Sequence, residues 1–300
     1  MQELKKILGI VGPKGGVGKS TISANLAIAL AELGRKVICV DLDFGAANLN
    51  AIFGIRKVEN TLDDFLLKKV KQLSDVLLDT DIKGLKIICG GDVPGIANMP
   101  YQRKMKLIRH LSMLGSDVVL LDLSAGVSFN VVDFLMITRQ ALLVTTPDIP
   151  SLMNVYSFIK SAAYRRLTVL FRQKKCPELL ELLEKAKDVE SHPNLRTMED
   201  FLLEARKIDP EMAEYGKRVL SSFKPYLVIN RVQTTADTKT GRVIDNLMHQ
   251  YLSMKSKGTM VIREDTALKA AAAKMRPVII ESPSSKFSLD LKRMALNLQR

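Results

Sequence analysis

The sequence predicts an α/β fold with a doubly wound, mainly parallel sheet flanked by helices. Short apolar runs typical of buried strands alternate with helical patterns along most of the 300 residues. A glycine-rich segment joins the first apolar run to the first helical pattern, and later runs end in aspartates. Strands that alternate with helices form parallel sheets, and such sheets bind ligands at the carboxyl ends of their strands. The pattern therefore predicts both the fold class and the edge of the sheet where a site should lie.

The glycine-rich segment, residues 12–21, has the sequence Gly-Pro-Lys-Gly-Gly-Val-Gly-Lys-Ser-Thr. It lies between the apolar run 7–11 and the helical pattern 22–33, which is the context of a phosphate-binding loop. Glycines let backbone N–H groups converge on an anion, and the N-terminus of the next helix adds positive potential. Pro13 replaces the first glycine of the usual pattern, so the loop is the variant K-G-G-x-G-K-[ST], with an additional lysine at its start. We expect a nucleotide site formed by Lys14, Gly15, Gly16, Val17, Gly18, Lys19, Ser20 and Thr21.

Two strand ends supply carboxylates close to this loop. Asp43 follows the second expected strand, and Asp122 ends a later one. A carboxylate at the carboxyl end of a strand, beside a phosphate loop, can hold magnesium or orient water. The loop pattern likewise places Lys19 at the terminal phosphates and the Ser20 hydroxyl at a magnesium ion. For Asp41 we expect a hydrogen-bonding or helix-capping role rather than a catalytic one.

The rest of the chain continues the alternation. Expected strands cover 36–41, 85–89, 117–122, 141–145, 226–231, 259–262 and 277–280, and expected helices cover 61–66, 101–114, 152 onward, 241–254, 265–274 and 284 onward. A loop is expected at 90–100, and the helix after it should carry a basic side formed by Arg103, Lys104, Lys106 and Arg109. Residues 172–223 differ, because they are charged and helical in pattern without a strand candidate. We expect a single domain, 1–300, with a helical insertion at 172–223 that packs on the main domain.

Composition limits the classes of protein that the chain can represent. The three cysteines are isolated, which argues against a zinc site, an iron–sulfur site and a disulfide framework, and suits a reducing cytoplasm. The sequence contains no signal-peptide pattern and no run of about 18 uncharged apolar residues. The formal net charge is +13, and residues 211–300 carry 16 Lys and Arg against 8 Asp and Glu. This basic third is expected to be either a solvated face or a contact for nucleic acid or an anionic membrane.

With these motifs, the chain resembles the MinD/ParA family of dimerising ATPases, nearest its MinD and FlhG branch. The loop variant K-G-G-V-G-K-[ST] is the mark of that family. The other similar segments are 41–49 (first switch), 122–126 (second switch), 144–148, 229–231 (the adenine-binding asparagine), and 262–265 and 276–278 (the C-terminal pattern of the MinD branch). The resemblance covers the chain apart from the expected insertion.

The resemblance implies an ATPase that binds Mg-ATP, forms a homodimer on ATP, hydrolyses it slowly until a partner stimulates the reaction, and acts as a spatial or assembly switch. Lys14 would reach the phosphates of the partner subunit, so the implied catalytic residues are Lys14, Lys19 and Asp43. The residues implied at magnesium are Ser20, Asp43 and Asp122, and those at the nucleotide include Asn230, which would select adenine, and Arg231.

The sequence leaves the partner and the location open. The expected contacts are a protein partner through 172–223, an anionic membrane or DNA, and the expected location is the cytoplasm, either free or peripheral at the inner membrane. The alternative function is a ParA-like partition protein that binds DNA non-specifically in its ATP form. An iron–sulfur carrier on the same scaffold is disfavoured because no C-x-x-C is present, and a ligase or reductase because no further catalytic constellation is found. In the final helix, Phe287, Leu291, Met294 and Leu298 recur at helical spacing, and we expect them to face the core.

Overall fold

The fold is built on an eight-stranded sheet with strand order β3-β4-β2-β5-β1-β6-β7-β8. This computed structural model describes residues 6–43, 47–91, 99–126, 128–138 and 140–299. The strands are β1 (Lys6–Val11), β2 (Val37–Leu42), β3 (Leu78–Asp79), β4 (Leu85–Ile88), β5 (Val118–Leu123), β6 (Gln140–Thr145), β7 (Tyr226–Val232) and β8 (Gly258–Arg263). All described pairings are parallel except that of the short edge strand β3 with β4. The predicted doubly wound, mainly parallel sheet is therefore confirmed.

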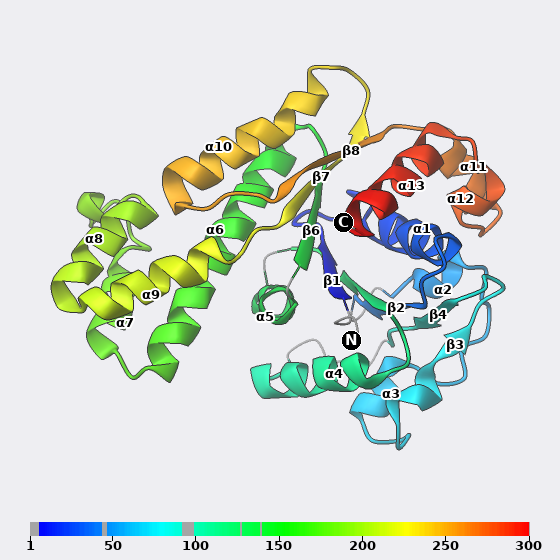
Figure 1. The fold of residues 1–300 in the computed structure, drawn as a ribbon, viewed down its shortest axis with the longest axis horizontal. Coiled ribbons are helices and arrows are strands. Elements are labelled where there is room, and N and C mark those ends of the chain that lie inside the picture. Colours follow the sequence, from blue (N-terminus) through cyan, green and yellow to red (C-terminus); the bar gives the residue numbers. More distant parts are fainter. Residues whose placement is uncertain (1–5, 44–46, 92–98, 127, 139, 300) are drawn as a thin grey trace.

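Helices cover both faces of this sheet (Figure 1). One layer contains α1 (Lys19–Glu32), α11 (Ala267–Ala273), α12 (Val278–Glu281) and α13 (Lys286–Gln299). The other contains α4 (Tyr101–Met113), α5 (Phe129–Ile137), α6 (Ile149–Gln173) and α10 (Thr240–Leu252). The remaining helices are α2 (Leu49–Ile52), α3 (Leu62–Leu66), α7 (Pro177–Lys185), α8 (Met198–Ile208) and α9 (Pro210–Ser221), with short 3₁₀ turns at Leu73–Val76, Pro193–Leu195 and Asp237–Lys239. Residues 44–46 of the expected first switch and 92–98 of the expected loop lie outside the described residues.

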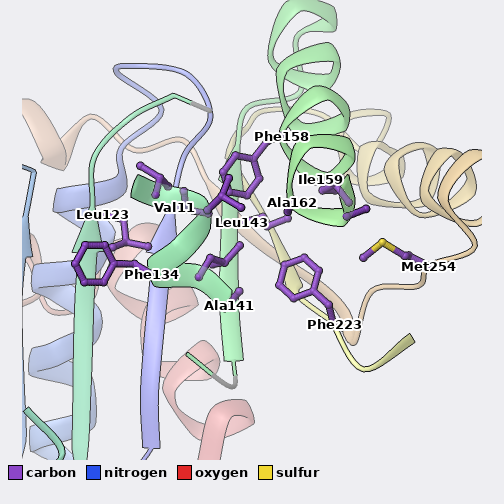
Figure 2. Packing of buried hydrophobic residues seen from close by; sticks show 14 of the residues in the cluster. Val11, Leu123, Phe134, Ala141, Leu143, Phe158, Ile159, Ala162, Phe223 and Met254 are labelled. Atoms are coloured by element: carbon purple, nitrogen blue, oxygen red, sulfur yellow. The ribbon is translucent and has the colours of Figure 1, made fainter. Parts of the chain in front are cut away.

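Each strand contributes side chains to two separate cores, because successive residues of a strand face opposite sides of a sheet. In β2, Val37 and Cys39 pack in the core that contains α1 and α13, whereas Ile38 and Val40 pack in the other core. Figure 2 shows this second core, where Phe134 of α5 and side chains of α6 lie over β1, β5 and β6. Burial on both faces explains why the strands are continuous apolar runs rather than alternating ones.

Helices α7, α8 and α9 form a helical lobe, residues 177–221, on the distal half of α6 (Figure 1). The Tyr164 hydroxyl of α6 donates to the carbonyl of Ala186 at 2.8 Å, at the end of α7. Gly216 allows α9 to approach α6 closely, since a Cβ there would lie 3.2 Å from Leu167 Cδ2. The helical pattern of 172–223 therefore forms helices packed on α6, whereas the assignment of this segment as an insertion in a single domain stays a prediction.

The last apolar run, 277–280, is not the strand that its composition predicts. Residues Val278–Glu281 form the short helix α12, with Pro277 at its N-cap. The Ile279 N–H donates to Asn25 Oδ1 of α1 at 2.9 Å, so the run packs on a helix instead of joining the sheet. Short apolar runs fit a buried helical turn as well as a strand, and proline cannot donate to a strand ladder. The prediction of a strand was wrong for these reasons.

The final helix, α13, has the orientation that its spacing predicts. Phe287, Leu291, Met294 and Leu298 are all 3% exposed or less, so the expectation that they face the core is confirmed. Within the described ranges, no helix combines the length and the apolar character that crossing a membrane requires.

Lys104 is buried, although we expected it on the exposed basic side of α4. Its side chain is 1% exposed, and its Nζ lies 2.8 Å from Oδ2 of Asp133 in α5. Asp133 is 2% exposed and also binds Arg165 of α6, with Nε 2.9 Å from Oδ1. Lys104 precedes the buried residues Leu107 and Leu111 by three and seven positions, a spacing that places all three on one helix face. This buried cluster ties α4, α5 and α6 together.

Replacing Asp133 by alanine is expected to lower the free energy of unfolding by about 3–5 kcal/mol, because Lys104 is then buried without a counter-charge. Urea denaturation followed by circular dichroism measures the change. Lys106→Ala, on the exposed face of the same helix, is the matched control and should change the free energy by about 0.5 kcal/mol or less. An Asp133→Ala protein as stable as the wild type would contradict this account of the cluster.

Candidate nucleotide-binding site

A cavity of about 1010 Å³ lies at the carboxyl ends of the central strands, the edge that the sequence predicts. This volume is at the upper end of the range for small-molecule sites. The glycine-rich loop and the start of α1 form one wall, and residues of α2, α5 and α11 form the others. From the loop and α1, the lining residues are Gly15, Gly16, Gly18, Lys19, Ser20 and Thr21.

The glycines of the loop are required by its conformation. Gly18 is the N-cap of α1 with φ 96°, and Gly16 has φ 77°, both in the region that favours glycine. A Cβ on Gly12 would lie 2.5 Å from Val17 Cγ2 and 2.7 Å from Lys19 Cγ, so the close turn also excludes a side chain there. The first turn of α1 contains no acidic residue. Its N-terminus at the cavity is therefore suited to an anion such as a phosphate.

The two aspartates after β2 have different environments. Asp41 is 1% exposed, and its carboxylate accepts three backbone N–H groups, from Asp43 at 3.0 Å, Asn48 at 3.0 Å and Leu49 at 3.1 Å. Burial raises the pKa of Asp41, although these hydrogen bonds oppose the shift. Asp43 lines the cavity, and its Oδ2 lies 3.8 Å from the Nζ of Lys19. The predicted hydrogen-bonding role of Asp41 is confirmed, and Asp43 is the carboxylate that faces the cavity.

Asp122, at the end of β5, is fully buried and only partly hydrogen-bonded. Its Oδ1 accepts from the Ser23 hydroxyl at 2.9 Å, whereas Oδ2 has no hydrogen-bond partner within the described part of the chain. Burial, with a contribution from the charge of Asp41, raises the pKa of Asp122 to about 7, although Ser20, Ser23 and Lys19 favour the charged form. A cation beside Oδ2 would favour the carboxylate again.

The available donors fit a magnesium ion. The hydroxyl of Ser20 and the carboxylate of Asp43 line the cavity, and Asp122, whose charged form Ser20 favours, has a buried oxygen without a hydrogen-bond partner among the described residues. Among the described residues, no group of three or more His, Cys, Asp or Glu side chains forms a metal cage. Magnesium in nucleotide sites is held by one or two protein oxygens, with phosphates and waters completing its shell. The sparse set of oxygens is therefore sufficient.

Lys14, the additional lysine of the loop, points to a different partner. Its Nζ lies 3.5 Å from Oδ1 of Asp148, and both side chains are 45% exposed. Asp148 is the N-cap of α6 and accepts from the N–H of Ser151 at 2.9 Å and from the hydroxyls of Ser151 and Thr146. Although burial opposes ionisation, these hydrogen bonds and the charge of Lys14 hold the pKa of Asp148 well below its usual range. An exposed ion pair of this kind contributes only about 0.2–1 kcal/mol, so Lys14 can leave Asp148 at little cost.

The end of β7 contacts the loop through two consecutive side chains. Asn230 is 6% exposed, and its Nδ2 donates to the Val17 carbonyl at 2.8 Å. The Nη2 of Arg231 donates to the Gly16 carbonyl, also at 2.8 Å. Arg231 lines the cavity, whereas Asn230 is outside its lining.

A comparison with models of known protein families shows which family the chain belongs to. The model of the CobQ/CobB/MinD/ParA nucleotide-binding domain matches residues 8–278. The chain belongs to this family. The matched range begins in β1 and ends in α12, so it includes the loop, the strand-end aspartates and β7.

Curated relatives and a solved structure agree with this assignment. The antiactivator FleN of Pseudomonas aeruginosa is 33% identical over 158 residues, which are 52% of this chain and 55% of FleN. The septum site-determining protein MinD of Helicobacter pylori is 35% identical over 151 residues, 49% of this chain and 55% of that protein. The chain thus spans about half the length of these relatives. MinD of Pyrococcus horikoshii, solved in complex with Mg-ADP, has the same fold, with a TM-score of 0.66, 22% identity and coverage of 99% and 96% of the two chains.

In this MinD/ParA-type site, the predicted residues fall into two groups. Those that line the cavity are Gly15, Gly16, Gly18, Lys19, Ser20, Thr21, Asp43 and Arg231. The others, Lys14, Val17, Asp122 and Asn230, lie outside its lining. The side chain of Val17 is 3% exposed and packs in the core with α1, so any contact of Val17 with a ligand would use its backbone.

Several residues of the site were not predicted. Asp148 follows β6, so the strand-end rule that selects Asp43 and Asp122 would also have selected it. Ser23 lies four residues after Lys19, on the same face of α1. By contrast, no local signal indicates that α11 lines the cavity, because this depends on how the chain returns after β8.

Asp41→Asn is expected to lower the free energy of unfolding by about 1.5–3 kcal/mol without nucleotide, because an amide replaces the charged acceptor of three backbone N–H groups. Asp43→Asn is the matched control. Its carboxylate approaches Lys19 only at 3.8 Å, so stability should change by about 0.5 kcal/mol or less. Thermal and urea unfolding of both variants make the comparison. Equal losses in the two proteins would contradict the separation of a structural from a cavity-facing aspartate.

Proposed function

We propose that this chain is an ATPase of the MinD/FlhG type, which binds Mg-ATP, dimerises on ATP and acts as a nucleotide-gated spatial or assembly switch. The observation that carries the proposal is that the two lysines of the loop differ in burial and in their position relative to the cavity. Lys19 is 8% exposed and lines the cavity, whereas Lys14 is 45% exposed and outside the lining. Lys19 can therefore bind the nucleotide of its own subunit, while Lys14 is accessible to the nucleotide of a second subunit.

Within one subunit, the loop and Lys19 would bind the phosphate chain. Backbone N–H groups at the N-terminus of α1 and the ammonium of Lys19 offset the negative charge that develops during phosphoryl transfer. Asp43, close to Lys19 and facing the cavity, is the candidate to orient the attacking water. Ser20 and Asp122 would hold magnesium, which supplies charge neutralisation at the phosphates when it is bound.

The surroundings of Lys14 suit a contact between two subunits. Asp148 begins α6, and the next turn of this helix exposes two large apolar side chains, Ile149 at 74% and Met153 at 56%. These two side chains are four residues apart on one face of the helix, so an association across this face would remove both of them from water. In a dimer across this face, Lys14 would exchange Asp148 for the phosphates of the partner subunit, so the catalytic site would be complete only after assembly.

The two lysines are expected to separate binding from assembly. Lys19→Ala should weaken ATP binding by about 100-fold or more, because it removes the buried cation at the phosphates. Lys14→Ala should change ATP affinity by no more than about threefold, because only an exposed pair is lost, yet it should abolish ATP-dependent dimerisation and hydrolysis. Calorimetry gives the affinities, and sedimentation velocity with Mg-ATP gives the oligomeric state. A Lys14→Ala protein that dimerises normally on ATP would refute the composite site.

Hydrolysis is expected to depend on protein concentration. Since Lys14 completes the site only in the dimer, phosphate release per subunit should be slow at low concentration and rise until dimerisation saturates. A phosphate-release assay over a dilution series, with sedimentation at the same concentrations, tests this expectation. Rapid turnover that stays constant per subunit under monomeric conditions would show that one subunit is sufficient.

A further inference from the structure

We propose that Ser23 is a positioning residue for the magnesium ion, because its hydroxyl holds the carboxylate of Asp122 in an orientation that leaves the other carboxylate oxygen available to the metal. The inference rests on the proposed function in taking a nucleotide with magnesium as the ligand. Ser23 lies two residues beyond the loop of residues 12–21 and outside the cavity lining. It is fully buried, in the second turn of α1.

Two hydroxyl side chains follow one face of α1 from the cavity toward β5. Ser20 lines the cavity, and Ser23 lies three residues later, a spacing that puts both side chains on the same face. Asp122 of β5 lies opposite Ile10 of β1, two residues before the loop begins at Gly12. The Oγ of Ser23 is 2.9 Å from Oδ1 of Asp122, so this hydrogen bond joins the helix after the loop to the strand beside it.

The orientation of the Asp122 carboxylate depends on a hydrogen-bond partner. The terminal torsion of an aspartate has a broad, roughly two-fold distribution, so rotamer preference alone does not fix where each oxygen points. Ser23 donates to Oδ1, whereas Oδ2 has no hydrogen-bond partner within the described ranges. Because both oxygens belong to one planar group, holding Oδ1 also sets the direction of Oδ2. Magnesium demands near-ideal octahedral geometry, so this direction affects how tightly the metal binds.

The Ser23 hydroxyl has two acceptors for its single proton. Its Oγ also lies 3.0 Å from the carbonyl oxygen of Lys19, which is the bond that a serine inside a helix commonly makes to its own backbone. A hydrogen bond to a carboxylate is roughly twice as strong as one to a neutral acceptor, so the proton is donated to Asp122. Removing the hydroxyl should therefore act on the carboxylate more than on α1.

A purely structural role for Ser23 predicts a different result from a positioning role. Ser288 of α13 is also fully buried, and its hydroxyl donates to the carbonyl of Ser282 at 2.8 Å. Ser288 is outside the cavity lining, so Ser288→Ala is the matched control for the loss of a buried hydroxyl. We expect Ser23→Ala and Ser288→Ala to lower the thermal unfolding temperature to a similar extent, whereas only Ser23→Ala should change metal binding.

Manganese is a paramagnetic probe for the magnesium position, because Mn²⁺ prefers the same oxygen ligands. Electron paramagnetic resonance measures the dissociation constant of Mn²⁺ from the protein–ADP complex, and calorimetry in EDTA measures the ADP affinity without metal. For Ser23→Ala we expect the Mn²⁺ affinity to fall roughly 10- to 100-fold, as when a hydrogen-bond partner of a metal ligand is removed. Its metal-free ADP affinity should stay within about twofold of the wild type.

Asp122→Ala completes a double-mutant cycle with Ser23→Ala. If Ser23 acts through Asp122, adding Ser23→Ala to Asp122→Ala should leave the Mn²⁺ affinity unchanged. Three results would each overturn the inference: wild-type Mn²⁺ affinity in Ser23→Ala, an equal loss of its metal-free ADP affinity, or an undiminished effect in the Asp122→Ala background. Wild-type protein that binds no ADP, or binds ADP without Mn²⁺, would instead contradict the proposed function, so the two failures are distinguishable.

Discussion

The nucleotide cavity depends on the orientation of the peptide groups in the loop of residues 12–21. Their N–H groups can converge on an anion only if the carbonyls of the same peptide units are held on the other side. Here the carbonyls of Gly16 and Val17 accept hydrogen bonds from β7, more than 200 residues further along the chain, with separations of 215 and 213 positions. The glycines make the turn possible, and two side chains of the distant strand hydrogen-bond to its carbonyls. The loop therefore combines a local motif with long-range contacts.

Three buried aspartates show how burial separates structural from ligand-binding carboxylates. Asp41 is satisfied by three backbone N–H groups, and Asp133 by Lys104 and Arg165. Asp122 retains an oxygen without a partner in the described chain. A buried charge is costly unless it is paired, so the incompletely paired carboxyl of Asp122 is the one of the three suited to a cation.

Helix α6 connects Asp148, which pairs with Lys14 of the loop, with the helical lobe. It has 25 residues, a length of roughly 40 Å, and it begins at the Asp148 cap that binds Lys14. Midway, Arg165 binds Asp133 of α5, the helix that also lines the cavity, and its distal half carries α7–α9. This one helix therefore joins the Lys14–Asp148 pair, the buried cluster around Asp133 and the helical lobe.

The sequence by itself determined the features that depend on neighbouring residues: the alternation of strands and helices, the loop before α1, the strand-end aspartates and the hydrogen-bonding role of Asp41. Each follows from periodicity or from geometry within a few residues, so it does not depend on contacts with distant parts of the chain. Tertiary structure decided the rest. Residues 277–280 became a helix because they pack on α1 beside Asn25, Lys104 was buried because Asp133 approaches from α5, and Asn230 contacts Val17 because β7 ends beside the loop. These outcomes depend on contacts between segments that are far apart in the sequence. A local pattern of residues does not specify which distant groups will come into contact.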